Sequence, residues 1–364
     1  MSSEKSPPTE LPNACESELS QQLDPQRPQF SWKRIGIAVS MAMLILVPWM
    51  VVTELGKDTL RASICNGQGI TPAQYRFSGK SDAFDLTNSL IPREQILSGG
   101  PPKDGIPALS NPKFVSAQEV KYLVGSDRVL GVEVAETARA YPLKILNYHE
   151  IVNDHIKDIA FAVTYCPLCD SAAVFDRRTS LGVREFGVSG LLYNSNVLMY
   201  DRSPSSESLW SQILSLGVTG KSKSEPLQAL PVELTTWKRW QDAHPQTKVL
   251  SASTGHNRDY SMNPYDTYFS HPNLMFPVRP ISNLLPVKER VLGVWVGKTF
   301  KAYPESWFRS RDGVIEDTLQ GKMVKVEFDA ETQTMRVAKA DDGVQWMYSL
   351  WFAWYAMHPT TSAL

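Results

Sequence analysis

Residues 128–142 read RVLGVEVAETARAYP, and residues 290–304 read RVLGVWVGKTFKAYP. Ten of these fifteen positions are identical. A second match follows, because WKRWQDAHPQTKVL at 237–250 shares Trp, Trp, His, Pro, Thr and Leu with WFAWYAMHPTTSAL at 351–364. A repeat of this kind determines the architecture. It predicts an internal duplication with two related units, 128–250 and 290–364.

The repeated stretches also predict local structure. The alternation in VLGVEV and VLGVWV is typical of strands, and the Ala-Tyr-Pro that follows suits a second strand with proline at its end. Trp237, Trp240 and His244 lie three and four residues apart, on one side of a helix. That helix should end near His244, because the residue before a proline disfavours the helical region. We expect structural helix-end roles for His244 and His358.

The first unit is longer than the second. The two matches are offset by 162 and 114 residues, so the first unit holds 48 residues that the second lacks. Short alternating runs typical of strands fill it, at 159–165, 171–176, 183–188 and 197–201. The sequence therefore predicts an α+β fold, mainly β, built from short antiparallel strands with a few helices. Residues 56–127 are expected to form an irregular approach segment that packs onto the first unit, and 251–289 a connector.

Composition excludes several classes of protein. The 364 residues are 42% apolar and 21% charged, which excludes a wholly disordered or fibrous chain. A net charge of −1 gives no general electrostatic affinity for nucleic acid. Four cysteines are too few for a disulfide-dense scaffold.

An uncharged run at 35–52, IGIAVSMAMLILVPWMVV, predicts a membrane anchor. As a helix it spans roughly 27 Å, near the minimum for the hydrocarbon core. A buried core helix and a cleaved signal peptide are the alternatives. Lys33 and Arg34 favour a cytoplasmic N-terminal tail, residues 1–34, which is expected to be disordered. The prediction is a single-pass protein of the inner (cytoplasmic) membrane with its body in the periplasm.

Cys166-Pro167-Leu168-Cys169 follows directly on a predicted strand. Two cysteines at this spacing close a small disulfide or present two thiolates to one metal ion. If a helical turn starts there, its free N–H groups lower the pKa of Cys166. Asp170 takes the place of the histidine in the C-x-x-C-H haem signature, so no haem is expected, nor a nucleotide cofactor.

His149 is the candidate third ligand, because it is expected to end the Tyr-Pro strand at the level of the cysteines. The run His149-Glu150-Ile151-Val152-Asn153 lacks the second histidine of the zinc-protease motif. His155 is expected to be solvated, while Met199, Met275 and His271 are weaker candidate ligands. The alignment of the units pairs side chains as follows: Tyr141 with Tyr303, Asp154 with Asp317, His149 with Asp312, Cys166 with Asp329 and Cys169 with Thr332.

Several long runs resemble one family. YPLKILNYHEIVND (141–154), VTYCPLCDSAAVFDR (163–177) and FGVSGLLYNSNVLMYDR (186–202) are similar to domain-of-unknown-function family 3179. The resemblance continues through SLWSQ (208–212) and TTWKRWQDAHPQTKVLS (235–251). It implies a bacterial or archaeal protein, often membrane-anchored or exported, without an established biochemical role. It supports His149, Cys166 and Cys169 as site residues, because they lie in these runs.

Three functions remain open at this stage. The leading hypothesis is a soft-metal site at Cys166, Cys169 and His149, binding copper or zinc. The second is a thiol–disulfide oxidoreductase with Cys166 as nucleophile. The third is a non-catalytic ligand-binding module in which the cysteines form a structural disulfide. The membrane is the one expected partner, and the sequence does not indicate a protein partner.

Overall fold

The computed structural model describes residues 83–364 except 204–206, 310 and 312. They belong to the second of two units of the chain, Ile70–Leu364. The predicted tail (1–34) and membrane anchor (35–52) lie outside the described residues, as do Cys15 and Cys65. In the part of the chain that is described, no helix is long and apolar enough to cross a membrane.

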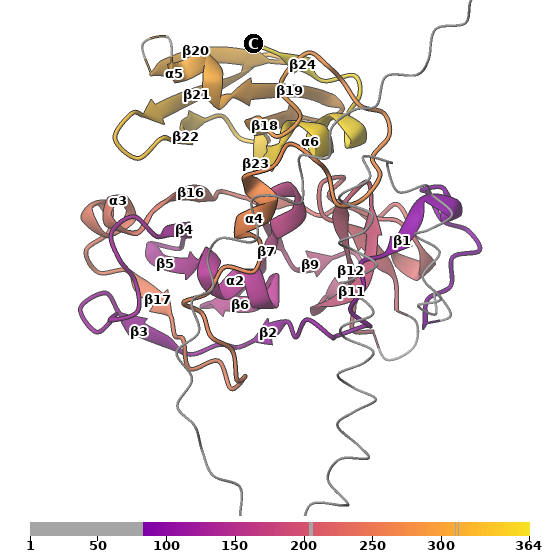
Figure 1. Cartoon of the computed structure of the whole chain (residues 1–364), viewed down its shortest axis with the longest axis horizontal. Helices are drawn as coiled ribbons and strands as arrows, with labels where there is room; N and C mark the ends of the chain where they lie inside the picture. Colours follow the sequence, from indigo (N-terminus) through magenta and orange to yellow (C-terminus); the bar gives the residue numbers. More distant parts are fainter. Residues whose placement is uncertain (1–82, 204–206, 310, 312) are drawn as a thin grey trace, which may run out of the picture. The chain divides into compact units, whose positions relative to one another are not determined.

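The prediction of a mainly β fold with few helices is confirmed (Figure 1). The largest sheet has the order β2 (Leu109–Ser110), β6 (Ile151–Ile156), β7 (Ile159–Cys166), β8 (Ser171–Asp176), β23 (Gln345–Leu350), β18 (Arg290–Val296), β19 (Thr299–Pro304) and β24 (Ser362–Ala363), with β15 (Ala229–Leu230) also paired to β8. A second sheet has the order β16 (Glu233–Thr236), β4 (Arg128–Val134), β5 (Thr137–Pro142), β17 (Lys248–Leu250) and β3 (Phe114–Ser116).

Three smaller sheets complete the strands. They are β20 (Val314–Leu319), β21 (Lys322–Asp329) and β22 (Thr334–Ala340); β1 (Ile96–Ser98), β11 (Phe186–Tyr193), β12 (Asn196–Asp201), β13 (Leu209–Ser211) and β14 (Leu216–Gly217); and β9 (Arg178–Thr179) with β10 (Gly182–Val183). The α-helices are α2 (Leu143–His149), α3 (Trp237–Ala243), α4 (Asp266–Phe269), α5 (Glu305–Arg309) and α6 (Trp351–Met357). Short 3₁₀ turns are η2 (Arg93–Gln95), η3 (Pro167–Cys169) and η4 (Gly220–Ser222).

We call residues 128–250 the first segment and residues 290–364 the second segment. Each segment begins with an antiparallel hairpin, β4–β5 or β18–β19. In the first hairpin Leu130 pairs with Tyr141, and in the second Leu292 pairs with Tyr303. A strand from later in the segment, β16 or β23, pairs with the first hairpin strand, and a last strand, β17 or β24, pairs in parallel with the second.

A tryptophan packs onto a glycine in each segment. The ring of Trp240 on α3 covers Gly131, and a Cβ at that glycine would lie 2.2 Å from the ring. The ring of Trp354 on α6 covers Gly293, where the same distance is 2.3 Å. Each indole N–H donates to a threonine seven residues later, at 2.9 and 3.0 Å. Both helices end one residue before a histidine, as the sequence predicts for α3.

A buried tyrosine binds a carboxylate in each segment. The hydroxyl of Tyr141 donates to Asp154 at 2.6 Å, and that of Tyr303 donates to Asp317 at 2.8 Å. Arg139 pairs with the first aspartate and a lysine with the second. Each contact ties the second hairpin strand to the three-stranded meander that follows it, β6–β7–β8 or β20–β21–β22.

The two segments contact each other through these meanders. β8 of the first segment pairs with β23 of the second, where Ala172 lies opposite Tyr348. β22 of the second segment contacts β16 of the first. The indole N–H of Trp346 on β23 donates to the carbonyl of Val232 at 2.9 Å. Each meander therefore extends toward a strand of the other segment.

The remaining parts of the chain extend the first segment. Among the described residues before β4, β2 pairs with β6 and β3 pairs with β17. The extra residues of the first segment form β11, β12 and β13, joined by β1 from the approach region. The predicted single strand at 183–188 is instead split between β10 and β11, which belong to different sheets.

We expect Gly131→Ala and Gly293→Ala each to lower the free energy of unfolding by about 1–3 kcal/mol, because the new methyl group displaces a packed indole. Urea denaturation of the full chain checks this. Gly125→Ala is the matched control, because its Cβ would meet Lys238 at an ordinary 3.4 Å. Equal stability of all three variants would contradict the packing argument.

Candidate thiol site at Cys166 and Cys169

The two cysteines lie in the turn that joins β7 to β8. β7 ends at Cys166, η3 contains Cys169, and Asp170 takes a left-handed conformation with φ 44° and ψ 31° before β8 begins. Both cysteines are free thiols, and at most 1% of either residue is exposed. All residues of β8 are buried, because this strand lies between β7 and β23 within the sheet.

A hairpin turn from the extra residues of the first segment covers the sulfurs. Asn194 and Ser195 have φ values of 49° and 65°, which suit a tight two-residue turn between β11 and β12. The carbonyl of Ser195 lies 3.1 Å from the Cys169 sulfur and 3.8 Å from the Cys166 sulfur. Asn196 also contacts Cys169 through its side chain. The turn therefore places a backbone carbonyl next to both sulfurs.

The two thiols differ in acidity. Burial would raise the pKa of Cys166, but the Cys169 thiol and the backbone N–H groups of Val197, Cys169 and Leu168 lower it below the usual value. Burial and the neighbouring Cys166 raise the pKa of Cys169 well above the usual value. The short contact to Ser195 then has the Cys169 S–H as donor. Cys166 is therefore the more acidic thiol of the pair.

A buried polar network supports the covering turn. The amide of Asn196 donates to Gln212 at 2.8 Å and to the hydroxyl of Ser171 at 3.1 Å. Gln212 in turn accepts from Ser171 at 2.6 Å and donates to Thr164 at 3.0 Å. These residues lie on β7, β8, β12 and the turn after β13, so the network fixes the extra strands against the cysteine hairpin.

Glu150 lies at the site, although the sequence analysis named it only as part of an incomplete zinc-protease motif. It follows α2 with φ 56° and ψ −34°, and its carbonyl accepts from the N–H of Tyr165 at 2.8 Å. Its carboxyl lines a mainly apolar cavity of about 170 Å³ together with Leu168 and Val197. Burial, and then the charge of Cys166, raises the pKa of Glu150 well above the usual value. Burial therefore favours the neutral form of Glu150, and no residue spacing signals its placement.

Both ring nitrogens of His149 contact residues other than the cysteines. The expectation that it ends a strand is wrong, because α2 begins directly after β5 and His149 is its last residue. Its Nδ1 lies 2.7 Å from the carbonyl of Pro107, and its Nε2 lies 2.6 Å from the hydroxyl of Tyr260. Within the described ranges, no three His, Cys, Asp or Glu side chains are arranged to hold a metal ion. His149 instead links α2 to the approach region and the connector.

The weaker candidates differ in where they lie. Met199 is buried on β12, in the same apolar cluster as both cysteines. Met275 and His271 are exposed residues of the connector, and Met275 lines the same cavity as Glu150 and Leu168. His155 is exposed, in agreement with the expectation that it is solvated.

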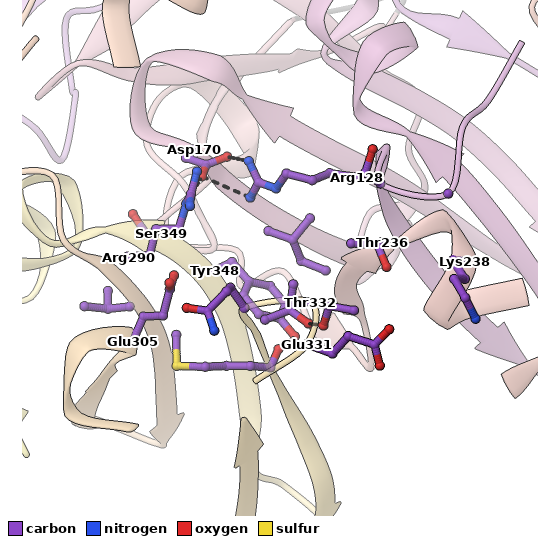
Figure 2. A pocket seen from close by; sticks show the side chains of 17 residues that line it. Arg128, Asp170, Thr236, Lys238, Arg290, Glu305, Glu331, Thr332, Tyr348 and Ser349 are labelled. Carbon is purple, nitrogen blue, oxygen red and sulfur yellow. Dashed lines mark hydrogen bonds and ion pairs between the residues drawn. The ribbon is translucent and has the colours of Figure 1, made fainter. Parts of the chain in front are cut away.

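Asp170 joins the cysteine turn to both segments. Its carboxylate accepts from Arg128 at 2.9 and 3.0 Å, and from Nε of Arg290 at 2.9 Å (Figure 2). The hydroxyl of Tyr165 donates to it at 2.8 Å. Burial would raise the pKa of Asp170, but the two arginines lower it, so the aspartate is charged. The two arginines are the first residues of β4 and β18.

The fold and site define a mainly β protein with a buried Cys-x-x-Cys turn. The family described as "Protein of unknown function (DUF3179)" matches residues 103–349, and the chain belongs to this family. The comparisons with curated proteins and with solved structures give no match.

We expect the environment of His149 to make stability depend on pH. Burial lowers its pKa from 6.5 to about 4, so between these values the unfolded chain binds a proton that the folded chain excludes. The resulting stability is complete above pH 6.5 and is lost as the pH falls toward 4. In thermal melts, His149→Gln should reduce this loss, whereas His155→Gln, an exposed control, should retain it. The same pH slope in both variants would contradict the assignment.

Proposed function

We propose that this chain is a thiol–disulfide oxidoreductase, held at the membrane by residues 35–52 with its body outside the cytoplasm. Cys166 is the nucleophile and Cys169 the resolving thiol. The observation that supports this most is the asymmetry of the pair. Backbone N–H groups and the Cys169 thiol stabilise charge on Cys166, while Cys169 faces the carbonyl of Ser195. A nucleophilic thiolate beside a protonated partner suits disulfide exchange.

The reaction balances without a further reagent. The Cys166 thiolate attacks one sulfur of a substrate disulfide, forming a mixed disulfide and releasing the first substrate thiolate. That thiolate takes the proton of Cys169. The Cys169 thiolate then attacks Cys166, closes the Cys166–Cys169 disulfide and releases the second substrate thiolate. Two cysteine thiols are oxidised and one substrate disulfide is reduced to two thiols.

The cavity beside the turn favours a small substrate. Both sulfurs are buried, so a folded protein surface does not reach them in this arrangement. The cavity of about 170 Å³ is lined by Leu168 and Val197, the neighbours whose N–H groups lower the pKa of Cys166, although neither cysteine itself lines it. A low-molecular-weight disulfide matches this approach better than a disulfide within a protein.

A soft metal ion is the second candidate. The two sulfurs share a hydrogen bond and both lie close to the carbonyl of Ser195, so both can turn toward one ion. With His149 engaged elsewhere, two thiolates suit Cu(I) better than Zn(II), which usually takes four ligands.

We also propose that the first and second segments arose by internal duplication. Their shared order of elements supports this, as do the equivalent Trp-on-Gly contacts and the equivalent tyrosine–aspartate pairs. Under this proposal, the thiols and the strands that cover them are features of the first segment alone.

Alkylation and disulfide exchange test the proposed activity. The full chain is purified in detergent under reducing conditions, with Cys15 and Cys65 replaced by serine so that only the pair reacts. We expect iodoacetamide to modify Cys166 at lower pH than Cys169, as followed by peptide mass spectrometry. With 2-hydroxyethyl disulfide, the parent should form the Cys166–Cys169 disulfide, Cys169→Ser should trap the mixed disulfide, and Cys166→Ser should not react.

Glu150→Gln is the matched control. Because burial raises the pKa of Glu150 and so favours its neutral form, the neutral isostere should leave the alkylation profile of Cys166 nearly unchanged. If copper copurifies with the chain in a one-to-one ratio and the Cys166–Cys169 pair does not undergo disulfide exchange, the metal-binding candidate is favoured. A pair that neither exchanges nor binds metal would contradict both.

A further inference from the structure

A second cavity lies on the other side of the cysteine turn, between the two segments. It measures about 450 Å³, which falls in the range of small-molecule sites. The first segment contributes Arg128, Leu234 and Thr236 to its wall (Figure 2). The second segment contributes Arg290 and Met335. Neither cysteine lines it, so this site is separate from the proposed redox pair.

Two arginines and two carboxylates line one end of this cavity. Arg128 and Arg290 share the carboxylate of Asp170, which is almost fully buried. The other carboxylate, Glu305, pairs with Arg309, which lies outside the lining. Two guanidinium groups that share one carboxylate keep donors for a further anion.

Arg290 has donors free to bind that anion. Only its Nε is engaged, by Asp170, and within the described residues its two Nη groups have no hydrogen-bond partner. Its side chain keeps 45% of its surface exposed. In Figure 2, Lys238 and Glu331 lie toward the opposite end of the cavity, away from Arg290. The donors open to an anion are thus those of Arg290.

The rest of the wall suits an apolar body. Leu234, Val291 and Met335 line the cavity together with the ring of Tyr348. The Tyr348 hydroxyl is already bound to the carbonyl of Met335 at 2.8 Å. A guanidinium with open donors binds carboxylate and phosphate alike. Inorganic phosphate has no apolar body to pack against this wall, which favours an organic carboxylate.

We propose that this cavity binds a small organic carboxylate, with the carboxylate paired to Arg290 and the apolar body against Leu234 and Met335. Because the ligand is held by residues from both segments, its binding stabilises their association. The ligand also touches the ion-paired group that holds Asp170, the residue directly after Cys169.

Saturation-transfer NMR on the full chain tests this with benzoate as the probe. Benzoate should bind the parent, while benzamide, its neutral counterpart, and inorganic phosphate should each bind about tenfold more weakly or not at all. Arg290→Gln should weaken benzoate binding by about tenfold or more. Thr332→Trp, which fills the cavity without touching Asp170, should also weaken it, and thermal melts establish that each variant is folded.

Two controls separate this site from the rest of the molecule. Lys113→Gln, at an exposed lysine that does not line the cavity, should bind benzoate like the parent. Replacing both Cys166 and Cys169 by serine should also leave binding unchanged, so failure of the redox proposal would not affect this one. Absence of benzoate binding, equal binding of benzamide or phosphate, or unchanged binding in folded Arg290→Gln would each overturn the proposal.

Discussion

The carboxylate of Asp170, bound by one arginine from each segment, is the interaction on which the rest of the structure depends. Arg128 and Arg290 begin the equivalent strands β4 and β18, so the two hairpins meet at a single buried charge. Removing either arginine would leave a buried carboxylate with less compensation, which is costly in a low-dielectric interior. The same residue ends the Cys-x-x-Cys turn, so the ion pairs that join the segments also determine where the sulfurs lie.

The extra residues of the first segment complete the site from the other side. The turn at Asn194 and Ser195 places a carbonyl over both sulfurs, and the network through Asn196 and Gln212 holds that turn against β7 and β8. Buried polar side chains of this kind are satisfied by one another, which favours a single arrangement of the strands. The position of the sulfurs between a turn of N–H donors and a carbonyl makes the two thiols chemically different.

His149 illustrates where reasoning from sequence failed. Its place beyond a Tyr-Pro strand favoured a ligand at the level of the cysteines, but the chain turns into α2 after Pro142. Seven helical residues rotate the imidazole toward Tyr260 and Pro107. Glu150 was missed for a related reason. It joins α2 to β6 with a positive φ, and this backbone places it beside Leu168 in the cavity wall. Such a backbone conformation leaves no pattern in the sequence.

The sequence by itself determined most of the strand pattern, the C-terminal end of the Trp-x-x-Trp helix α3 and the family of the chain. These features follow from local periodicity and from repeated residues, whose partners lie at similar sequence separations in each segment. Only the tertiary structure decided that Asp170 binds two arginines 162 residues apart, that Glu150 rather than His149 lies beside the thiols, and that a charged cavity opens between the segments. The physical reason is that burial and charge compensation depend on which distant side chains meet, and alternation and spacing do not specify those contacts.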